Sequence, residues 1–140
     1  MAGARWRNVV IGGAAALGLL AAAPPEQTLH VGLRNRSGAT LECHAIAGHW
    51  YGFDLGTIAA GRDMTVTVGI DPATGTISLP NSLHQPVPLQ SIYCGVAGEA
   101  WRTRADLPLH RLATLAMIGA GDVRRMIVVC RMRGATLGCG

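Results

Sequence analysis

The chain has 140 residues, 49% of them hydrophobic, and a formal net charge of +4. Arginine supplies all 12 of the Lys/Arg positions, which we attribute to a GC-rich bacterial genome, and Arg5 and Arg7 lie in a segment that we expect to be removed. So mild a charge argues against a nucleic-acid-binding protein, and the length allows one domain with its own core.

The first 23 residues have the layout of a secretory signal peptide. A basic start is followed by an unbroken run of apolar and small residues over 9–23, and then by Pro24 and Pro25. The run is shorter than the roughly 20 residues of a membrane-spanning helix. We therefore expect a signal peptide over 1–23, a single domain over 24–140, and a periplasmic or secreted protein. Because proline is a poor first residue after cleavage, an uncleaved N-terminal anchor is the alternative, and a membrane is a partner only in that case.

Beyond the signal segment, apolar and polar residues alternate between glycine-rich turns, which is typical of half-buried antiparallel strands. We expect an all-β, mainly antiparallel fold, a small β-sandwich of about eight strands. The expected strands, in chain order, are 28–34, 39–46, 64–70, 76–79, 89–96, 100–105, 124–132 and 135–139, with 50–55 as an optional ninth.

Two stretches break the alternation. Residues 81–88 contain two prolines and are expected to form a loop or a connection between sheets. Residues 107–118 are expected to form a short helix with Asp106 as its N-cap, because leucines recur there on neighbouring helical turns and a glycine follows. A strand over 113–118 is the alternative.

A short segment occurs twice with one difference. Residues 38–43 read GATLEC and residues 134–139 read GATLGC, and each copy follows an apolar strand and a turn that contains arginine. We interpret the two copies as one β-hairpin design used twice, which predicts an ordered hairpin at the C-terminus.

Four cysteines in a small exported chain predict two disulfides. If residues 134–135 form a two-residue turn with glycine first, Cys130 faces Cys139 in a non-hydrogen-bonded pair, with about 4.5 Å between Cα atoms. Cys43 and Cys94 are then left to pair, and we expect this bridge to tie distant parts of the chain, for example two sheets. A zinc site is the alternative for four cysteines, but no C-x-x-C pair occurs.

Signals for chemistry are weak. His44 and His49 lie close enough in the sequence to suggest a Cu or Zn site, although polar strand and turn positions are the simpler interpretation. The sequence lacks a G-x-S-x-G motif, a neighbouring pair of carboxylates and a phosphate-binding glycine loop. We therefore predict no enzyme, no catalytic residue and no cofactor.

The aromatic residues offer the clearest candidate for binding. Trp50 and Trp101 each follow a mid-strand cysteine, and the simpler interpretation is that both pack over a Cys43–Cys94 bridge as part of the core. The functional interpretation is an exposed platform of Trp50, Tyr51 and Trp101 for an unknown protein or glycan partner. We expect an exported, non-catalytic β-sandwich that binds or scaffolds. The alternatives are a periplasmic metal-binding protein that uses His44 and His49, or a membrane-tethered accessory subunit of a larger complex.

Overall fold

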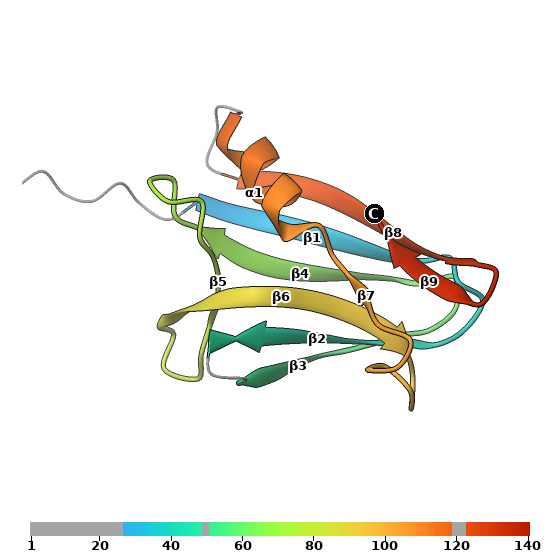
Figure 1. Cartoon of the computed structure of the whole chain (residues 1–140). Coiled ribbons are helices and arrows are strands. Elements are labelled where there is room, and N and C mark those ends of the chain that lie inside the picture. Colours follow the sequence, from blue (N-terminus) through green and yellow to red (C-terminus); the bar gives the residue numbers. More distant parts are fainter. Residues whose placement is uncertain (1–26, 49–50, 119–122) are drawn as a thin grey trace, which may run out of the picture.

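The computed structural model describes residues 27–48, 51–118 and 123–140, which fold into strands and a short helix (Figure 1). The elements in chain order are β1 (Gln27–Asn35), β2 (Leu41–Ala47), β3 (Gly52–Ile58), β4 (Asp63–Ile70), β5 (Ile77–Pro80), β6 (Pro86–Val96), β7 (Ala105–Asp106), α1 (Leu109–Ile118), β8 (Val123–Arg133) and β9 (Thr136–Cys139). The predicted all-β, mainly antiparallel fold is confirmed, and the optional ninth strand is present as β3. The expected signal segment, residues 1–23, lies outside the described residues. Within the described ranges, no helix has both the length and the apolar character needed to cross a membrane.

The nine strands of the described residues belong to one mixed sheet. The strand order is β3-β2-β6-β5-β4-β1-β8-β9, and β7 pairs with β6 beside this path. Neighbouring strands are antiparallel except β1 and β8, which run parallel. Strand β6 pairs with β5 over its first residues and with β2 over the rest. It therefore joins two parts of the sheet, which we call the β2 half (β2, β3, β7 and the end of β6) and the β1 half (β1, β4, β5, β8 and β9).

The sheet curls so that the β2 half faces the β1 half. Strands β6 and β8 are four steps apart in the strand order, which would be roughly 19 Å in a flat sheet at the usual strand spacing. The Sγ atom of Cys94 on β6 nevertheless lies within 4.8 Å of the Sγ atoms of Cys130 on β8 and Cys139 on β9. The two halves are therefore layered like a sandwich, with a common core between them.

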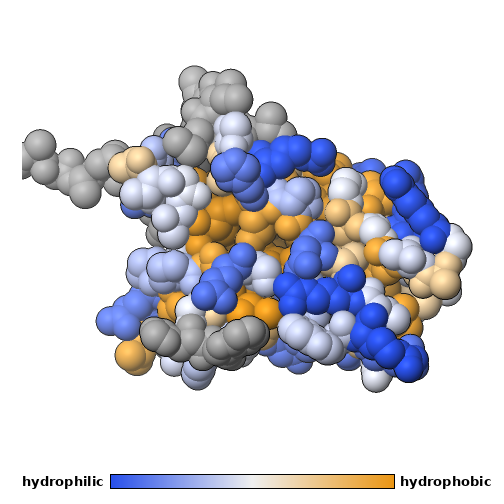
Figure 2. Space-filling view, viewed as in Figure 1, coloured by the Kyte–Doolittle hydropathy of each residue, from blue (hydrophilic) through white to orange (hydrophobic). Residues whose placement is uncertain are grey.

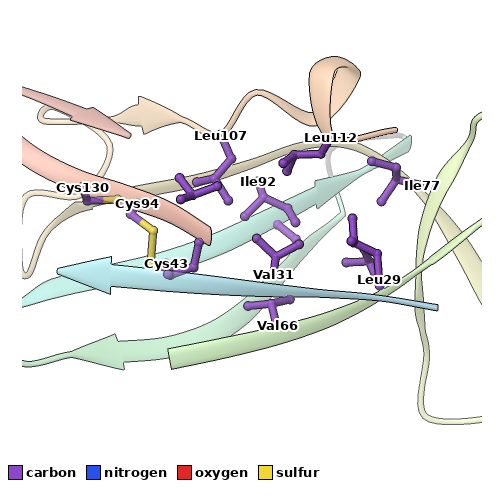
Figure 3. Packing of buried hydrophobic residues seen from close by; sticks show 14 of the residues in the cluster. Leu29, Val31, Cys43, Val66, Ile77, Ile92, Cys94, Leu107, Leu112 and Cys130 are labelled. Carbon is purple, nitrogen blue, oxygen red and sulfur yellow. A yellow bond between two sulfur atoms is a disulfide. The ribbon is translucent and has the colours of Figure 1, made fainter. Parts of the chain in front are cut away.

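Inward-facing residues of both halves build this core (Figure 3). From Leu29 on in β1, and throughout β2, every second residue is buried and most of the residues between are partly exposed, as the alternating sequence predicts. Leu107 and Leu112 extend the core to the segment that carries α1. The largest fully buried side chains are Leu29, Val31, Leu33, Asn35, Leu41, Cys43, Ile58, Val68, Ile70, Ile92, Leu112 and Val128.

Residues 81–88, which contain the two prolines, form the expected loop only as far as Gln85, and Pro86 begins a strand. The chain turns over residues 82–84 and enters β6 at Pro86, which lies opposite Pro80 of β5. Residues two apart on a strand direct their N–H groups to the same side. The prolines at 86 and 88 therefore remove donors from one side of β6, while Val87 between them keeps its own. Strand β6 itself then passes from the β1 half to the β2 half.

The helix predicted over 107–118 is confirmed as α1, and the alternative of a strand there is wrong. The prediction that Asp106 caps it is also wrong. The Leu112 amide donates to the carbonyl oxygen of Pro108 at 3.0 Å, so Pro108 stands at the N-cap. Asp106 lies opposite Tyr93 of β6, and this pairing holds it in an extended conformation that ends before the helix begins.

The repeated segment forms a hairpin in one place and not in the other. At the C-terminus, β8 and β9 pair in the predicted register, with Gly134 at a φ of 63°. In the first copy, β1 lies between β4 and β8, whereas β2 lies between β3 and β6, so β1 and β2 are not partners. The chain crosses there between the two halves, around the buried side chain of Asn35. The hairpin interpretation is therefore wrong for residues 38–43.

Both predicted disulfides are present. Cys130–Cys139 and Cys43–Cys94 each link directly opposed residues, with 4.1 Å between the Cα atoms in each pair. The expectation that Cys43–Cys94 joins two sheets is wrong, because β2 and β6 are neighbours in the β2 half. Two disulfides with no free cysteine are typical of a protein that folds in an oxidising environment.

Candidate binding surface around Trp101

The chain after β6 folds back instead of forming the strand predicted over 100–105. The Glu99 amide donates to the carbonyl oxygen of Val96 at 2.8 Å, and the Thr103 amide donates to the carbonyl oxygen of Glu99 at 3.0 Å. The Thr103 hydroxyl also accepts from the Val96 amide at 2.7 Å, so it occupies a donor that a further paired strand would need. Two residues remain as strand in β7. We call residues 97–103 the Trp101 turn.

Gly95 allows the Trp101 turn to lie against β6. A Cβ atom at this position would stand 2.2 Å from the carbonyl oxygen of Ala100 and 2.4 Å from its Cα atom. Real Cβ atoms do not approach backbone so closely, so a side chain at Gly95 would force the turn away from the strand. The close contact therefore fixes the point at which the Trp101 side chain leaves the turn.

The indole of Trp101 is exposed yet held in place. It remains 63% exposed, although its ring meets the ring of Tyr93 edge to face, at 5.9 Å between centroids. The Arg104 guanidinium lies over both rings, with its Cζ atom 4.9 Å from the Trp101 centroid and 4.6 Å from the Tyr93 centroid. Arg104 in turn binds the Asp106 carboxylate at 2.5 Å and the Ser91 hydroxyl at 3.2 Å. Contacts of this kind restrict the indole without covering it.

Alternation along the strands brings His44 to the same cluster. Because Cys43 and Cys94 point into the core, His44 and Tyr93 point outward, and their rings lie 5.4 Å apart. The tyrosine ring is covered by its neighbours and is only 9% exposed. The Nε2 atom of His44 lies 3.9 Å from a carboxylate oxygen of Glu42 on the same face of β2.

An open hollow of ≈ 540 Å³ lies beside the indole. Its walls come from β2 and from the Trp101 turn. They are lined by Glu42, Gly98, Glu99, Ala100, Trp101 and Arg102. The Arg102 guanidinium pairs with the Glu99 carboxylate at 2.5 Å, so both signs of charge border the hollow. Figure 2 shows hydrophilic residues gathered around the C-terminal end of β6, where the Trp101 turn begins. The cluster of Trp101, Tyr93, Arg104 and His44, with this hollow, is named the Trp101 surface.

The structure separates the aromatic residues that the sequence suggested as one platform. Trp101 and Tyr51 are both exposed, at 63% and 68%, so the interpretation of Trp101 as core is wrong. Tyr51 bonds through its carbonyl oxygen to the amide of Ala47, at the far end of β2 from Glu42. Glu42 and Ala47 are five positions apart along the strand, or roughly 17 Å. Trp50 lies outside the described residues, as does His49.

Three residues of the site, Tyr93, Arg104 and Gly95, were not expected there from the sequence. Tyr93 precedes the inward-facing Cys94, so the alternation already placed it outward on the face of β6. Arg104 precedes the acidic Asp106 by two residues, and on an extended segment such residues share a face. No sequence pattern reveals the contact of Gly95 with the turn, because it depends on the fold.

The sequence offered two groups of candidate metal ligands, and of the histidine pair only His44 lies among the described residues. Among the residues that the structure describes, the group with ligand atoms within 4.8 Å of one another consists of Cys94, Cys130 and Cys139, and His44 is not part of it. All three cysteines are oxidised in disulfides. A disulfide sulfur lacks the thiolate charge that binds a metal.

Comparisons with known proteins do not assign the chain to a family. No family model matches it, and no curated protein matches it in sequence. Among solved structures, it is similar to the NMR structure of the protein from Eubacterium rectale, with a TM-score of 0.43 and 6% identity over 81% of this chain and 87% of that chain. A likeness of this size carries no argument about function.

Proposed function

We propose that the chain is an exported, non-catalytic binding module that holds a protein partner on the Trp101 surface. The observation that carries the proposal is a tryptophan that is 63% exposed and yet fixed by the Tyr93 ring and the Arg104 guanidinium. An exposed side chain that is already ordered loses little conformational freedom when a partner covers it.

The residue types favour a protein as the partner. Tryptophan, tyrosine and arginine are the side chains that most often carry the energy of protein–protein interfaces, near the centre of the contact. Charged residues typically form the rim. On the Trp101 surface, Glu42, Glu99 and Arg102 border the hollow in this way.

Export is the second part of the proposal. We place the protein in the periplasm of a bacterium or outside the cell, because residues 1–23 have the layout of a signal peptide and the two disulfides suit an oxidising compartment. The intact mass of the mature protein tests this part. Loss of about the first 23 residues supports release, whereas a mass that includes Met1 would make the protein a tethered subunit.

A paired substitution tests the binding site. Wild type, Trp101→Ala and Tyr51→Ala are immobilised and exposed to a cell-envelope extract of the producing organism, and retained proteins are quantified by mass spectrometry. We expect one partner to be retained by wild type and Tyr51→Ala and reduced by about 30-fold or more on Trp101→Ala, as for a hot-spot residue. Tyr51 is the matched control because its side chain is equally aromatic and exposed.

Two outcomes would contradict the proposal. Equal loss on both variants would indicate adhesion to any exposed aromatic, and the absence of a Trp101-dependent protein would leave the surface without a protein partner. Digesting the extract with protease beforehand separates the partner classes. Binding that depends on Trp101 but survives the digestion would identify a glycan instead.

A further inference from the structure

The four cysteine sulfurs gather at one end of the core, where the two halves of the sheet face each other. The Sγ atoms of Cys94, Cys130 and Cys139 lie within 4.8 Å of one another, although Cys94 belongs to one disulfide and the other two form the second. Figure 3 shows Cys43, Cys94 and Cys130 together at this end. A sulfur of one disulfide can therefore reach a sulfur of the other without any strand changing partners.

The four cysteine residues differ in their exposure to solvent. Cys43, Cys94 and Cys130 are fully buried, whereas Cys139 is partly exposed. Cys139 also lies on β9, the last strand in the sheet order and the last of the chain. A thiol from solution would therefore meet Cys139 first.

We propose that the two disulfides exchange with each other when a small thiol attacks Cys139. The thiolate sulfur bonds to Sγ of Cys139, the Cys130–Cys139 bond breaks, and Cys130 leaves as a thiolate. The Cys130 thiolate then bonds to Sγ of Cys94, the Cys43–Cys94 bond breaks, and Cys43 leaves as a thiolate that takes a proton from water. Two disulfides exist before and after, so the attacking thiol is the sole co-reactant.

The exchange changes what the sulfur bridges hold together. The starting bridges each link neighbouring strands, β2 to β6 and β8 to β9. The product Cys94–Cys130 links β6 to β8, across the core from one half to the other, and releases β9. The protein would thus carry a thiol-sensitive switch, which is independent of the Trp101 surface.

Peptide mapping can follow the switch without ambiguity. The chain contains no lysine, and trypsin cleaves after arginine so that each cysteine falls on its own peptide, 37–62, 63–102, 126–131 or 134–140. A link between peptides 63–102 and 126–131 reports the Cys94–Cys130 bridge. Acid quenching stops the exchange, because exchange needs a thiolate, and alkylating the remaining free thiols before digestion then fixes the pattern.

Two variants that break the same disulfide make a matched test. Cys43→Ser leaves the Cys94 thiol, whose Sγ position is within 4.8 Å of both sulfurs of the other bridge, while Cys94→Ser leaves Cys43, which is not in that group. At about pH 8, where a free thiol is partly ionised, we expect peptide 63–102 of Cys43→Ser to become linked to 126–131 or 134–140. Cys94→Ser should keep the native link between 126–131 and 134–140.

The wild-type protein gives a second measurement that does not depend on how well the variants fold. After incubation with reduced glutathione, we expect glutathione on peptide 134–140 together with the link between 63–102 and 126–131. The proposal is overturned if neither variant exchanges, if both exchange equally, or if wild type carries glutathione on 37–62 or 63–102 without any link across the halves.

Discussion

The two copies of the repeated segment, residues 38–43 and 134–139, differ in fold although they differ in one residue of sequence. Each begins with a glycine at positive φ, 81° at Gly38 and 63° at Gly134, and each ends in a cysteine that bridges to the residue opposite. The second copy closes a hairpin, whereas the first carries the chain from the β1 half to the β2 half.

The residues before the glycine explain the difference. In the first copy, the side-chain amide of Asn35 is fully buried and donates to the carbonyl oxygens of Ala39 and Ile58 at 2.7 and 2.8 Å. Its Oδ1 atom accepts from the amide of Ser37 at 3.0 Å. In the second copy, Arg133 lies directly opposite Thr136. The local segment therefore sets the positive φ of the glycine, while a buried polar group upstream determines where the next strand goes.

The largest difference between the copies should appear in their disulfides. The Cys43–Cys94 bridge spans 51 residues and the Cys130–Cys139 bridge spans 9. In the chain-entropy model, replacing both cysteines of the pair by alanine should lower the free energy of unfolding by about 4 kcal/mol for the first bridge and about 2.5 kcal/mol for the second. Urea unfolding of the two double variants measures both values. Equal losses would show that loop length does not govern the two bridges.

Asn35→Ala should have the next largest effect. It should lower the free energy of unfolding by about 3 kcal/mol, because two carbonyl oxygens and an amide lose their buried partner. Asn81→Ala is the control. Asn81 makes similar bonds to the amides of Leu83 and Gln85, but in an exposed turn, so water can replace it and the loss should be about 1 kcal/mol or less. Thermal unfolding of both variants measures the two losses of stability. Equal losses for Asn35→Ala and Asn81→Ala would show that the buried bonds of Asn35 do not hold the crossing between the halves.

The glycines should give the smallest effect and no difference between the copies. A Cβ atom added at Gly38 or Gly134 meets no atom within 4 Å, so the cost of alanine is confined to the backbone conformation at positive φ. Alanine at either glycine should lower the free energy of unfolding by about 1 kcal/mol. A loss several times larger at Gly38 than at Gly134, measured by the same urea titration, would mean that the two turns are not equivalent.

Much of the fold was predictable because burial follows a period of two along the strands. That pattern located β1, β2, β4, β8 and β9, and the turn at residues 134–135 fixed the register that pairs Cys130 with Cys139. The pattern says nothing about which strand lies beside which. It therefore missed the crossing at Asn35 and the passage of β6 between the halves.

The binding surface was predictable only in part. Trp101 stood out because it follows the mid-strand Cys94, but the strand interpretation of residues 100–105 hid its contact with Arg104, and His44 is remote in the sequence. The turn forms because Thr103 satisfies a strand donor and Gly95 has no Cβ atom. Both causes are contacts within residues 95–103 that depend on how the chain turns, which a single sequence does not display.

The central claim is that the position of Trp101, and not its mere presence, creates the binding surface. Gly95→Ala tests it most directly, since it keeps every exposed side chain but pushes the Trp101 turn from β6. In the envelope-extract assay, with near-wild-type far-ultraviolet circular dichroism as the control for folding, we predict that Gly95→Ala loses the partner as completely as Trp101→Ala. Full retention by Gly95→Ala would contradict the account.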